Sequence, residues 1–403
     1  MDIFGQTPLQ SILFFILYGT TGAMPFFAAL YLLLCRGNAF APEITPPVRL
    51  RRWAASFFIV SALGHVWWML FYVHSRDLRF LDAVPPSVGY VAVVVLDCVT
   101  LLTTLAGTLL SMLQDRQRHM WPVYVAMVPF LVLGGVLMVN PSQQILFIAI
   151  AYVLLLYVLF TVYMVFAVRR YGRWLNDNYA DLENKKVWLS QVVTLGCLLM
   201  FMLYTLVEID AILLMFLLHF TELVLFGLLL WRVETLPELQ TLPLPLPVKE
   251  GSDYSQGDDS ANSLSTPLPH REGQGESLVG LEGLLVGGAL AEIEQRLAEH
   301  CVATQLYLQH DLTLQQLAQT IGTNRSYLSQ YFSRQGITYN TYINNLRINH
   351  FISLYQKAVA AGQPVVAQEL ASESGYRSYS TFSLAFKQRT GQSVTAWMRD
   401  ARV

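Results

Sequence analysis

The N-terminal part of the chain consists of long apolar runs, and these constrain the fold more than any other feature. Each run approaches the roughly 20 residues that an α-helix needs to cross about 30 Å of hydrocarbon. The seven runs lie near Leu9–Cys35, Trp53–Val73, Ser87–Leu113, Pro122–Val139, Ile145–Val168, Leu189–Val207 and Ala211–Trp231. A soluble core does not need apolar stretches of this length. We therefore predict an α-helical membrane bundle of about seven spans.

Composition divides the chain into three regions. Hydrophobic residues make up 54% of the chain and charged residues 13%, well below the roughly 25% charged residues of soluble proteins. Residues 1–232 carry 14 basic and 12 acidic residues, residues 233–284 carry two and nine, and residues 285–403 carry ten and seven. We predict a membrane domain over 1–232, an acidic Pro/Ser/Gly-rich linker over 233–288 and a polar helical domain over 289–403. Low hydrophobicity and acidic charge favour disorder in the linker.

The charges of the loops predict the orientation in the membrane. Segments 36–52, 114–121 and 169–188 carry eleven Lys and Arg residues, whereas the alternate loops carry only Arg76 and Arg79. The positive-inside rule places the first set in the cytoplasm, with the N-terminus outside and the C-terminal domain in the cytoplasm. Segment 169–188 is interpreted as a solvated loop. Two alternatives are a segment on the membrane surface and one that transmits a signal to the C-terminal domain.

The C-terminal domain begins with the pattern of a helix-turn-helix motif. Four apolar or small residues recur at helical spacing, Gly322 is suited to end that helix, and Asn324 is suited to cap the next. Two further apolar residues, four apart, should face the first helix. The apolar positions are Leu314, Leu317, Ala318 and Ile321 in the first helix, and Leu328 and Phe332 in the second.

The same pattern recurs about fifty residues later. A predicted helix containing Val365, Val366, Leu370 and Ala371 ends at Gly375, and a second helix begins at Ser378 with Phe382 and Phe386 facing inward. A helix from about Tyr339 to Lys357 joins the two motifs. The sequence thus predicts an all-α domain with two helix-turn-helix motifs.

Residues from about Ile293 to Met398 resemble the DNA-binding domain of the AraC/XylS family of bacterial regulators. The matching positions are Leu314, Leu317, Ala318, Gly322, Tyr327, Leu328, Phe332, Leu346, Arg347, Ile348, Ala371, Gly375, Tyr376, Ser378, Phe382, Phe386, Lys387 and Gly391. With its apolar N-terminal part, the chain resembles the membrane-embedded members of the family. The resemblance implies a location in the bacterial inner membrane. It also implies that the second helix of each motif enters the major groove of double-stranded DNA, in successive turns roughly 34 Å apart.

The resemblance, together with helical spacing, indicates which side chains would face DNA. Gln330 has the geometry to pair with adenine, while Arg325 or Arg334 would hold phosphates. Leu384 departs from the polar residue common in the family, so the second motif is expected to read sequence less strongly. The alternative for each polar side chain is simple solvation. The predicted DNA-binding residues are Arg325, Ser326, Ser329, Gln330, Ser333 and Arg334 in the first motif, and Tyr379, Ser380, Ser383, Leu384 and Lys387 in the second.

Four ionisable residues fall near the middles of predicted spans: His65, Asp97, His219 and Glu222. A charge at this depth costs several kcal/mol unless it is paired or hydrated, so these side chains should face one another or a cavity. One interpretation is a sensing site for a ligand, a proton or a metal ion. The other is an interhelical hydrogen-bond network that only fixes the bundle.

The remaining motifs argue against an enzyme. Cys35, Cys98, Cys197 and Cys301 are not paired at C-x-x-C spacing and none lies in an outer loop, so they indicate neither a zinc site nor a disulfide. We predict no metal and no cofactor, and the chain has no common catalytic motif. The predicted function is a one-component transcription regulator controlled by an unknown signal ligand through repacking or homodimerisation of the spans. The alternative is a membrane scaffold or transporter-like protein whose tail is an interaction or autoregulatory module. Salt distinguishes the two hypotheses. Binding of the C-terminal domain to DNA should weaken steeply as the salt concentration rises, whereas a tail that binds protein and not DNA should be insensitive to salt.

Overall fold

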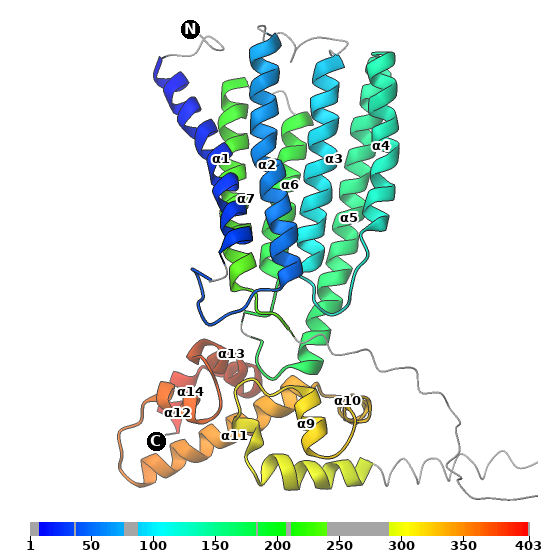
Figure 1. Ribbon diagram of the computed structural model, residues 1–403. Coiled ribbons are helices and arrows are strands. Elements are labelled where there is room, and N and C mark those ends of the chain that lie inside the picture. Colours follow the sequence, from blue (N-terminus) through cyan, green and yellow to red (C-terminus); the bar gives the residue numbers. More distant parts are fainter. Residues whose placement is uncertain are drawn as a thin grey trace, which may run out of the picture. The chain divides into compact units, whose positions relative to one another are not determined.

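A computed structural model describes residues 8–35, 38–75, 88–182, 184–206, 211–239 and 290–401. Within these ranges the chain is helical and contains no β-strand, and an isolated antiparallel bridge joins Tyr179 and Thr313. The chain forms two compact units (Figure 1). The N-terminal unit comprises the described parts of Met1–Trp174 and Asn184–Thr241, and the C-terminal unit those of Leu175–Glu183 and Leu242–Val403. The all-α prediction is confirmed.

Seven helices, one for each predicted apolar run, make up most of the N-terminal unit. Six of them are long and apolar enough to cross a membrane, judged by length and composition. The exception is α6, which provides a shorter apolar helix over Trp188–Tyr204. The count of about seven spans is therefore approximate. The helices are α1 (Pro8–Leu34), α2 (Val48–Ser75), α3 (Val88–Ser111), α4 (Trp121–Val139), α5 (Gln143–Asn178), α6 (Trp188–Leu206) and α7 (Ala211–Thr235).

Helices α2 and α7 make many of the packing contacts of the N-terminal unit, while α4 packs on α3. Helix α2 contacts α1 and α3, while α7 contacts α1, α2 and α6. Large apolar side chains remain exposed on the outer faces, and examples are Phe27, Phe147 and Phe166. A soluble protein rarely leaves so many large apolar side chains exposed. Lipid is the environment that suits such a surface.

The N-terminal unit extends past the predicted start of the linker at residue 233. Glu234 is fully buried, accepts a hydrogen bond from the Tyr31 hydroxyl at 2.9 Å and pairs with Arg51 at 3.4 Å. The Leu239 amide donates to Gln114 at 2.8 Å. These buried polar contacts hold residues 233–239 in the unit. The rest of the predicted linker, residues 240–288, lies outside the described residues.

Helix α5 corrects the interpretation of segment 169–188 as a loop. The helix continues to Asn178, ten residues beyond the predicted end of the apolar run. Tyr171 and Leu175 are almost fully buried, so this part of α5 is stabilised by packing rather than by lipid. Residues 175–182 belong to the C-terminal unit, where Ala180 is buried in the hydrophobic core.

The C-terminal unit contains two helix-turn-helix motifs joined by one long helix. After a helix over residues 290–297 come the π-helix η2 (Ala298–Val302) and the 3₁₀-helix η3 (Leu306–Leu308). The first motif consists of α9 (Leu314–Thr320) and α10 (Arg325–Arg334), and the second of α12 (Ala367–Glu373) and α13 (Tyr379–Thr390). Helix α11 (Tyr339–Ala360) joins them, and α14 (Val394–Asp400) follows.

The predicted turn and cap residues of the motifs are confirmed. Gly322 and Gly375 adopt φ angles of +70° and +86°. The side chain of Asn324 accepts a hydrogen bond from the Tyr327 amide at 2.9 Å, and Ser378 caps α13 in the same way. One detail differs, because α12 begins at Ala367 and therefore excludes Val365 and Val366. Val366 is instead the residue that precedes the helix, in extended conformation.

Each motif has its own hydrophobic core, and a buried arginine links the two. Leu317, Leu328 and Phe332 lie in the first core, and Phe382 and Phe386 in the second. The links come from Arg347 of α11, which is 1% exposed. Its guanidinium donates to the backbone carbonyls of Tyr307 and Gln309, each at 2.7 Å, and its Cζ lies 5.5 Å from the ring centre of Tyr376.

Candidate functional site

The N-terminal unit contains a largely apolar, partly open cavity of about 520 Å³. Side chains from α1, α2, α3, α6 and α7 line it, and most of them are aromatic or aliphatic. The four ionisable residues predicted inside the spans all belong to this lining: His65, Asp97, His219 and Glu222. A mostly apolar cavity with a few convergent polar groups is typical of a ligand-binding site.

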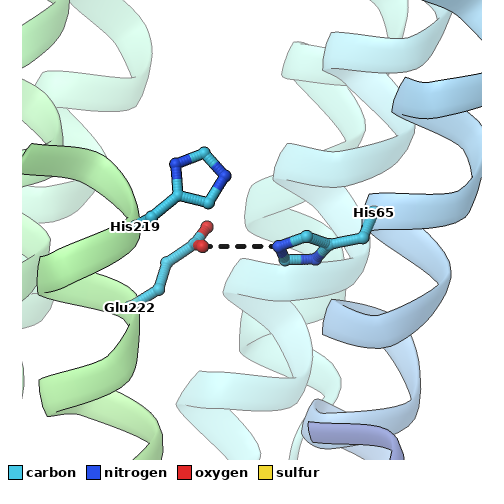
Figure 2. Close-up of side chains that lie close together, drawn as sticks. All are labelled: His65, His219 and Glu222. Atoms are coloured by element: carbon cyan, nitrogen blue, oxygen red, sulfur yellow. Dashed lines mark ion pairs between the residues drawn. The ribbon is translucent and has the colours of Figure 1, made fainter. Parts of the chain in front are cut away.

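Three of the four ionisable residues converge on one point between α2 and α7. His65 Nε2 lies 3.5 Å from Glu222 Oε2, and the imidazole rings of His65 and His219 have centroids 6.0 Å apart. Figure 2 shows His219 and Glu222 projecting from one helix toward His65 on the other. Helix α1 approaches this point at Gly22, where an added Cβ atom would make an ordinary van der Waals contact, 3.4 Å from the Cβ of His65.

Asp97 is held by a different set of contacts. Its carboxylate accepts hydrogen bonds from the indole nitrogens of Trp67, at 2.8 Å, and of Trp68. Gly64 leaves room for this arrangement, since a Cβ there would lie 3.2 Å from Asp97 Oδ1. Two charge-stabilising donors thus keep a carboxylate at the cavity wall.

The first helix-turn-helix motif presents one polar face of α10. Leu328 and Phe332 are buried against α9, and the opposite face carries the predicted DNA-binding side chains. Ser326, Gln330, Ser333 and Arg334 are exposed, and Ser329 is partly exposed. Spacings of three and four residues place these side chains on one surface of the helix.

The second motif presents a shorter polar face on α13. Ser380, Leu384 and Lys387 are exposed and Ser383 is partly exposed. Tyr379 differs from its predicted outward position, because it is partly buried and packs on the second core, with its ring 5.8 Å from that of Phe382. As the first residue of α13, it lies near the aromatic side chains of the core, which cover much of its apolar surface.

Residues 317–400 match a family model described as a helix-turn-helix domain. The chain thus contains a helix-turn-helix domain. The match supports an AraC/XylS-like DNA-binding domain and a role in regulating transcription, and such a domain is regulatory rather than catalytic. No curated protein and no solved structure matches the chain.

Arg325, one of the two arginines predicted to contact phosphates, is hydrogen-bonded within the C-terminal unit. Arg325, the first residue of α10, donates from Nε to Asn178 Oδ1 at 2.9 Å. Burial lowers the pKa of its guanidinium, which still stays charged at neutral pH. The segment that carries Asn178 is held further by Asn340, which donates to the carbonyls of Tyr179 and Ala180 at 3.2 and 2.7 Å.

Two exposed side chains beside these faces were not predicted to contact DNA. Tyr327 is 60% exposed on α10 and lies three residues before Gln330, so it shares the polar face. Arg377, immediately before the cap of α13, is also exposed. Helical spacing is the signal that places Tyr327 on this face.

Proposed function

We propose that this chain is a membrane-tethered, one-component transcription regulator that reads DNA with both helix-turn-helix motifs. One observation carries the proposal: a single polypeptide joins six helices able to cross a membrane to a helix-turn-helix domain. A regulator that senses at the membrane and acts on DNA needs both parts. Regulation by a second protein would not require them on one chain.

The proposed location is the bacterial inner membrane, with the N-terminus outside and the helix-turn-helix domain in the cytoplasm. The excess of Lys and Arg in segments 36–52, 114–121 and 169–188 supports this orientation. It places the C-terminal unit in the compartment that contains DNA. The resemblance to AraC/XylS regulators supports the bacterial assignment.

We infer that α10 and α13 enter successive major-groove turns. On α10, Gln330 and Ser329 would contact base edges and Arg334 a phosphate. On α13, Ser380, Ser383 and Lys387 would have these roles, and Leu384 would contact a thymine methyl. Tyr379 would add little base contact from its partly buried position.

The cavity of the N-terminal unit is the proposed site of the signal. A ligand that binds one packing of α2 and α7 more tightly than another would shift the equilibrium between them. Residues 175–182 offer a covalent route for this change. Residues 175–178 end the same helix that carries the apolar run of α5, and residues 175–182 pack in the C-terminal unit beside the first motif.

Genome-wide crosslinking and sequencing of DNA bound to the full-length chain tests the proposal. The variant is a Ser329→Ala, Gln330→Ala double substitution on α10. The matched control is Gln356→Ala, Gln363→Ala, which removes two exposed glutamines at and beyond the end of α11. We expect peaks with a bipartite motif in the wild type and the control, and their loss in the α10 variant.

Two results would contradict the proposal. The absence of enriched DNA under several growth conditions would favour the scaffold or interaction-module alternative. Peaks that persist unchanged in the α10 variant would exclude Ser329 and Gln330 as base contacts. Binding of the purified chain to a recovered site should also weaken steeply as salt rises, because Lys and Arg displace condensed counterions from DNA.

A further inference from the structure

The side chains of His65, His219 and Glu222 form a donor set that suits a metal ion. One ligand atom from each residue lies within 4.8 Å of the other two. We propose that these residues bind one divalent transition-metal ion of the Zn²⁺ type, and that this ion is a signal or a required part of the signal site. The second half of this statement rests on the proposed function, whereas the first half does not.

The hydrogen bonds of both histidines prepare them as metal ligands. His219 Nδ1 lies 2.6 Å from the Met215 carbonyl, and His65 Nδ1 lies 2.9 Å from the Ser61 carbonyl. When each Nδ1–H donates to its carbonyl, the lone pair on Nε2 is free to bind a cation. This is the arrangement that holds most zinc-binding histidines in proteins. The 3.0 Å contact between His65 Nε2 and the Thr21 hydroxyl is the one that an ion would replace.

Glu222 supplies the third ligand. Its Oε2 atom is buried and has no hydrogen-bond partner among the described residues, although it lies at ion-pair distance from His65. A buried carboxylate oxygen without a donor is costly, and a cation would offset this cost. Asp97 is not part of the donor set, because its carboxyl oxygens accept hydrogen bonds from the indole nitrogens of Trp67 and Trp68.

The distances imply a small closure on binding. Ligands 2.0–2.1 Å from a tetrahedral zinc ion lie roughly 3.4 Å from one another. His65 Nε2 and Glu222 Oε2 already lie 3.5 Å apart, and the other donor pairs, which lie within 4.8 Å, must approach by at most about 1.4 Å. Side-chain rotation or a small movement of α2 toward α7 would achieve this. Because the ligands come from both helices, binding of the ion would favour one packing of this pair.

The donor types favour transition metals over Ca²⁺ and Mg²⁺. Two imidazole nitrogens and one carboxylate suit zinc and its neighbours, whereas Ca²⁺ and Mg²⁺ prefer sites built from oxygen ligands. Three protein ligands leave a fourth position of the ion open. That position would face the cavity, where water or a donor group of a second molecule would complete the coordination.

Metal titration of the purified full-length chain tests the site. The chain is prepared in detergent with a histidine-free affinity tag, stripped with a chelator and titrated with Co²⁺, whose visible absorption reports the coordination geometry. We expect one Co²⁺ per chain, displaced by Zn²⁺. His65→Gln, His219→Gln and Glu222→Gln should each weaken binding by about 100-fold or more, since even loss of a group that only supports a ligand costs 10- to 100-fold.

Three controls separate the site from surface binding and from misfolding. His310→Gln, which removes an exposed histidine of the C-terminal unit, and Thr21→Val should both retain the affinity of the wild type. Glu222→His, whose donor nitrogen has about the same reach as the carboxylate, should retain Co²⁺ with a shifted visible spectrum, which a disrupted fold would not produce. Failure to bind one equivalent of Co²⁺ or Zn²⁺, or equal affinity in the wild type and the three ligand variants, would overturn the metal site.

DNA mapping then separates this inference from the proposed function. If the chain binds the ion and His219→Gln changes DNA occupancy in the same direction as zinc depletion, both statements are supported. If the ion binds but neither change alters occupancy, the metal site stands and its role as the signal is overturned. If the wild-type chain shows no enriched DNA at all, the result counts against the proposed function and leaves the metal site standing.

Discussion

Gly375 and Gly336 have similar backbone conformations but different surroundings. Their φ angles are +86° and +67°, in the region that L side chains rarely adopt. A Cβ atom on Gly375 would lie 2.7 Å from the Leu308 carbonyl oxygen, whereas a Cβ on Gly336 would meet nothing within 4 Å. The pair thus separates the cost of the φ angle from the cost of crowding.

We expect Gly336→Ala to destabilise the C-terminal unit by about 1 kcal/mol, the usual cost of a left-handed conformation for a non-glycine residue. Gly375→Ala should cost about 3 kcal/mol, because the Leu308 backbone must also move. Hydrogen exchange of the α11 amides, measured in the full-length chain at increasing denaturant concentration, gives the free energy of unfolding of the C-terminal unit in both variants. An equal decrease in the free energy of unfolding in the two variants would mean that the Leu308 backbone moves aside without an energetic cost.

At the scale of single elements, the end of α5 is the segment that most directly bears on DNA binding. Asn178 accepts a hydrogen bond from Arg325, the first residue of α10. Arg325 cannot keep this geometry and also direct Nε at a phosphate. The contact therefore competes with the proposed use of Arg325 on DNA, and the two states of the segment would bind DNA with different affinities.

We expect Asn178→Ala to raise the affinity of the full-length chain for its DNA site by about 3- to 10-fold, the equivalent of one hydrogen bond to a charged group at partial exposure. Fluorescence anisotropy with the chain in nanodiscs measures the change. In the Arg325→Ala background the Asn178 substitution should have no effect, and Arg325→Ala alone should bind more weakly. Unchanged affinity in Asn178→Ala would show that this contact does not restrain the first motif.

Features that depend on neighbouring residues in the sequence could be predicted, whereas features that depend on residues far apart in the sequence could not. The turns and caps of the motifs were predicted because Gly322, Asn324 and Ser378 act on their own neighbours in sequence. The end of α5 accepts a hydrogen bond at Asn178 from Arg325, 147 positions away in the sequence, and no local pattern reports such a contact. Likewise, spacing placed His219 and Glu222 on one face of a helix, but only the packing of α2 against α7 brings His65 to them.

At the scale of the whole molecule, the two motifs of the C-terminal unit are held in a fixed relation. The 22 residues of α11 extend over roughly 33 Å at 1.5 Å per residue. Arg347 links the first core to the second motif, since it donates to the carbonyls of Tyr307 and Gln309 and its guanidinium lies over the ring of Tyr376. Burial lowers the pKa of the Arg347 guanidinium. The group is still charged at neutral pH, and the carbonyl oxygens that accept its hydrogen bonds stabilise that charge. The spacing between α10 and α13 should therefore not adapt to the DNA.

This rigidity predicts how binding depends on the distance between half-sites. In a site recovered by DNA mapping, an insertion of five base pairs between the half-sites turns one of them to the opposite face of the duplex. An insertion of ten restores the face but lengthens the separation by about 34 Å. We expect both insertions to weaken binding by at least about 100-fold, because each removes the base contacts of one motif. A flexible connection would instead tolerate the ten-base-pair insertion, so recovery of affinity at ten but not at five would show that α11 and Arg347 do not fix the spacing.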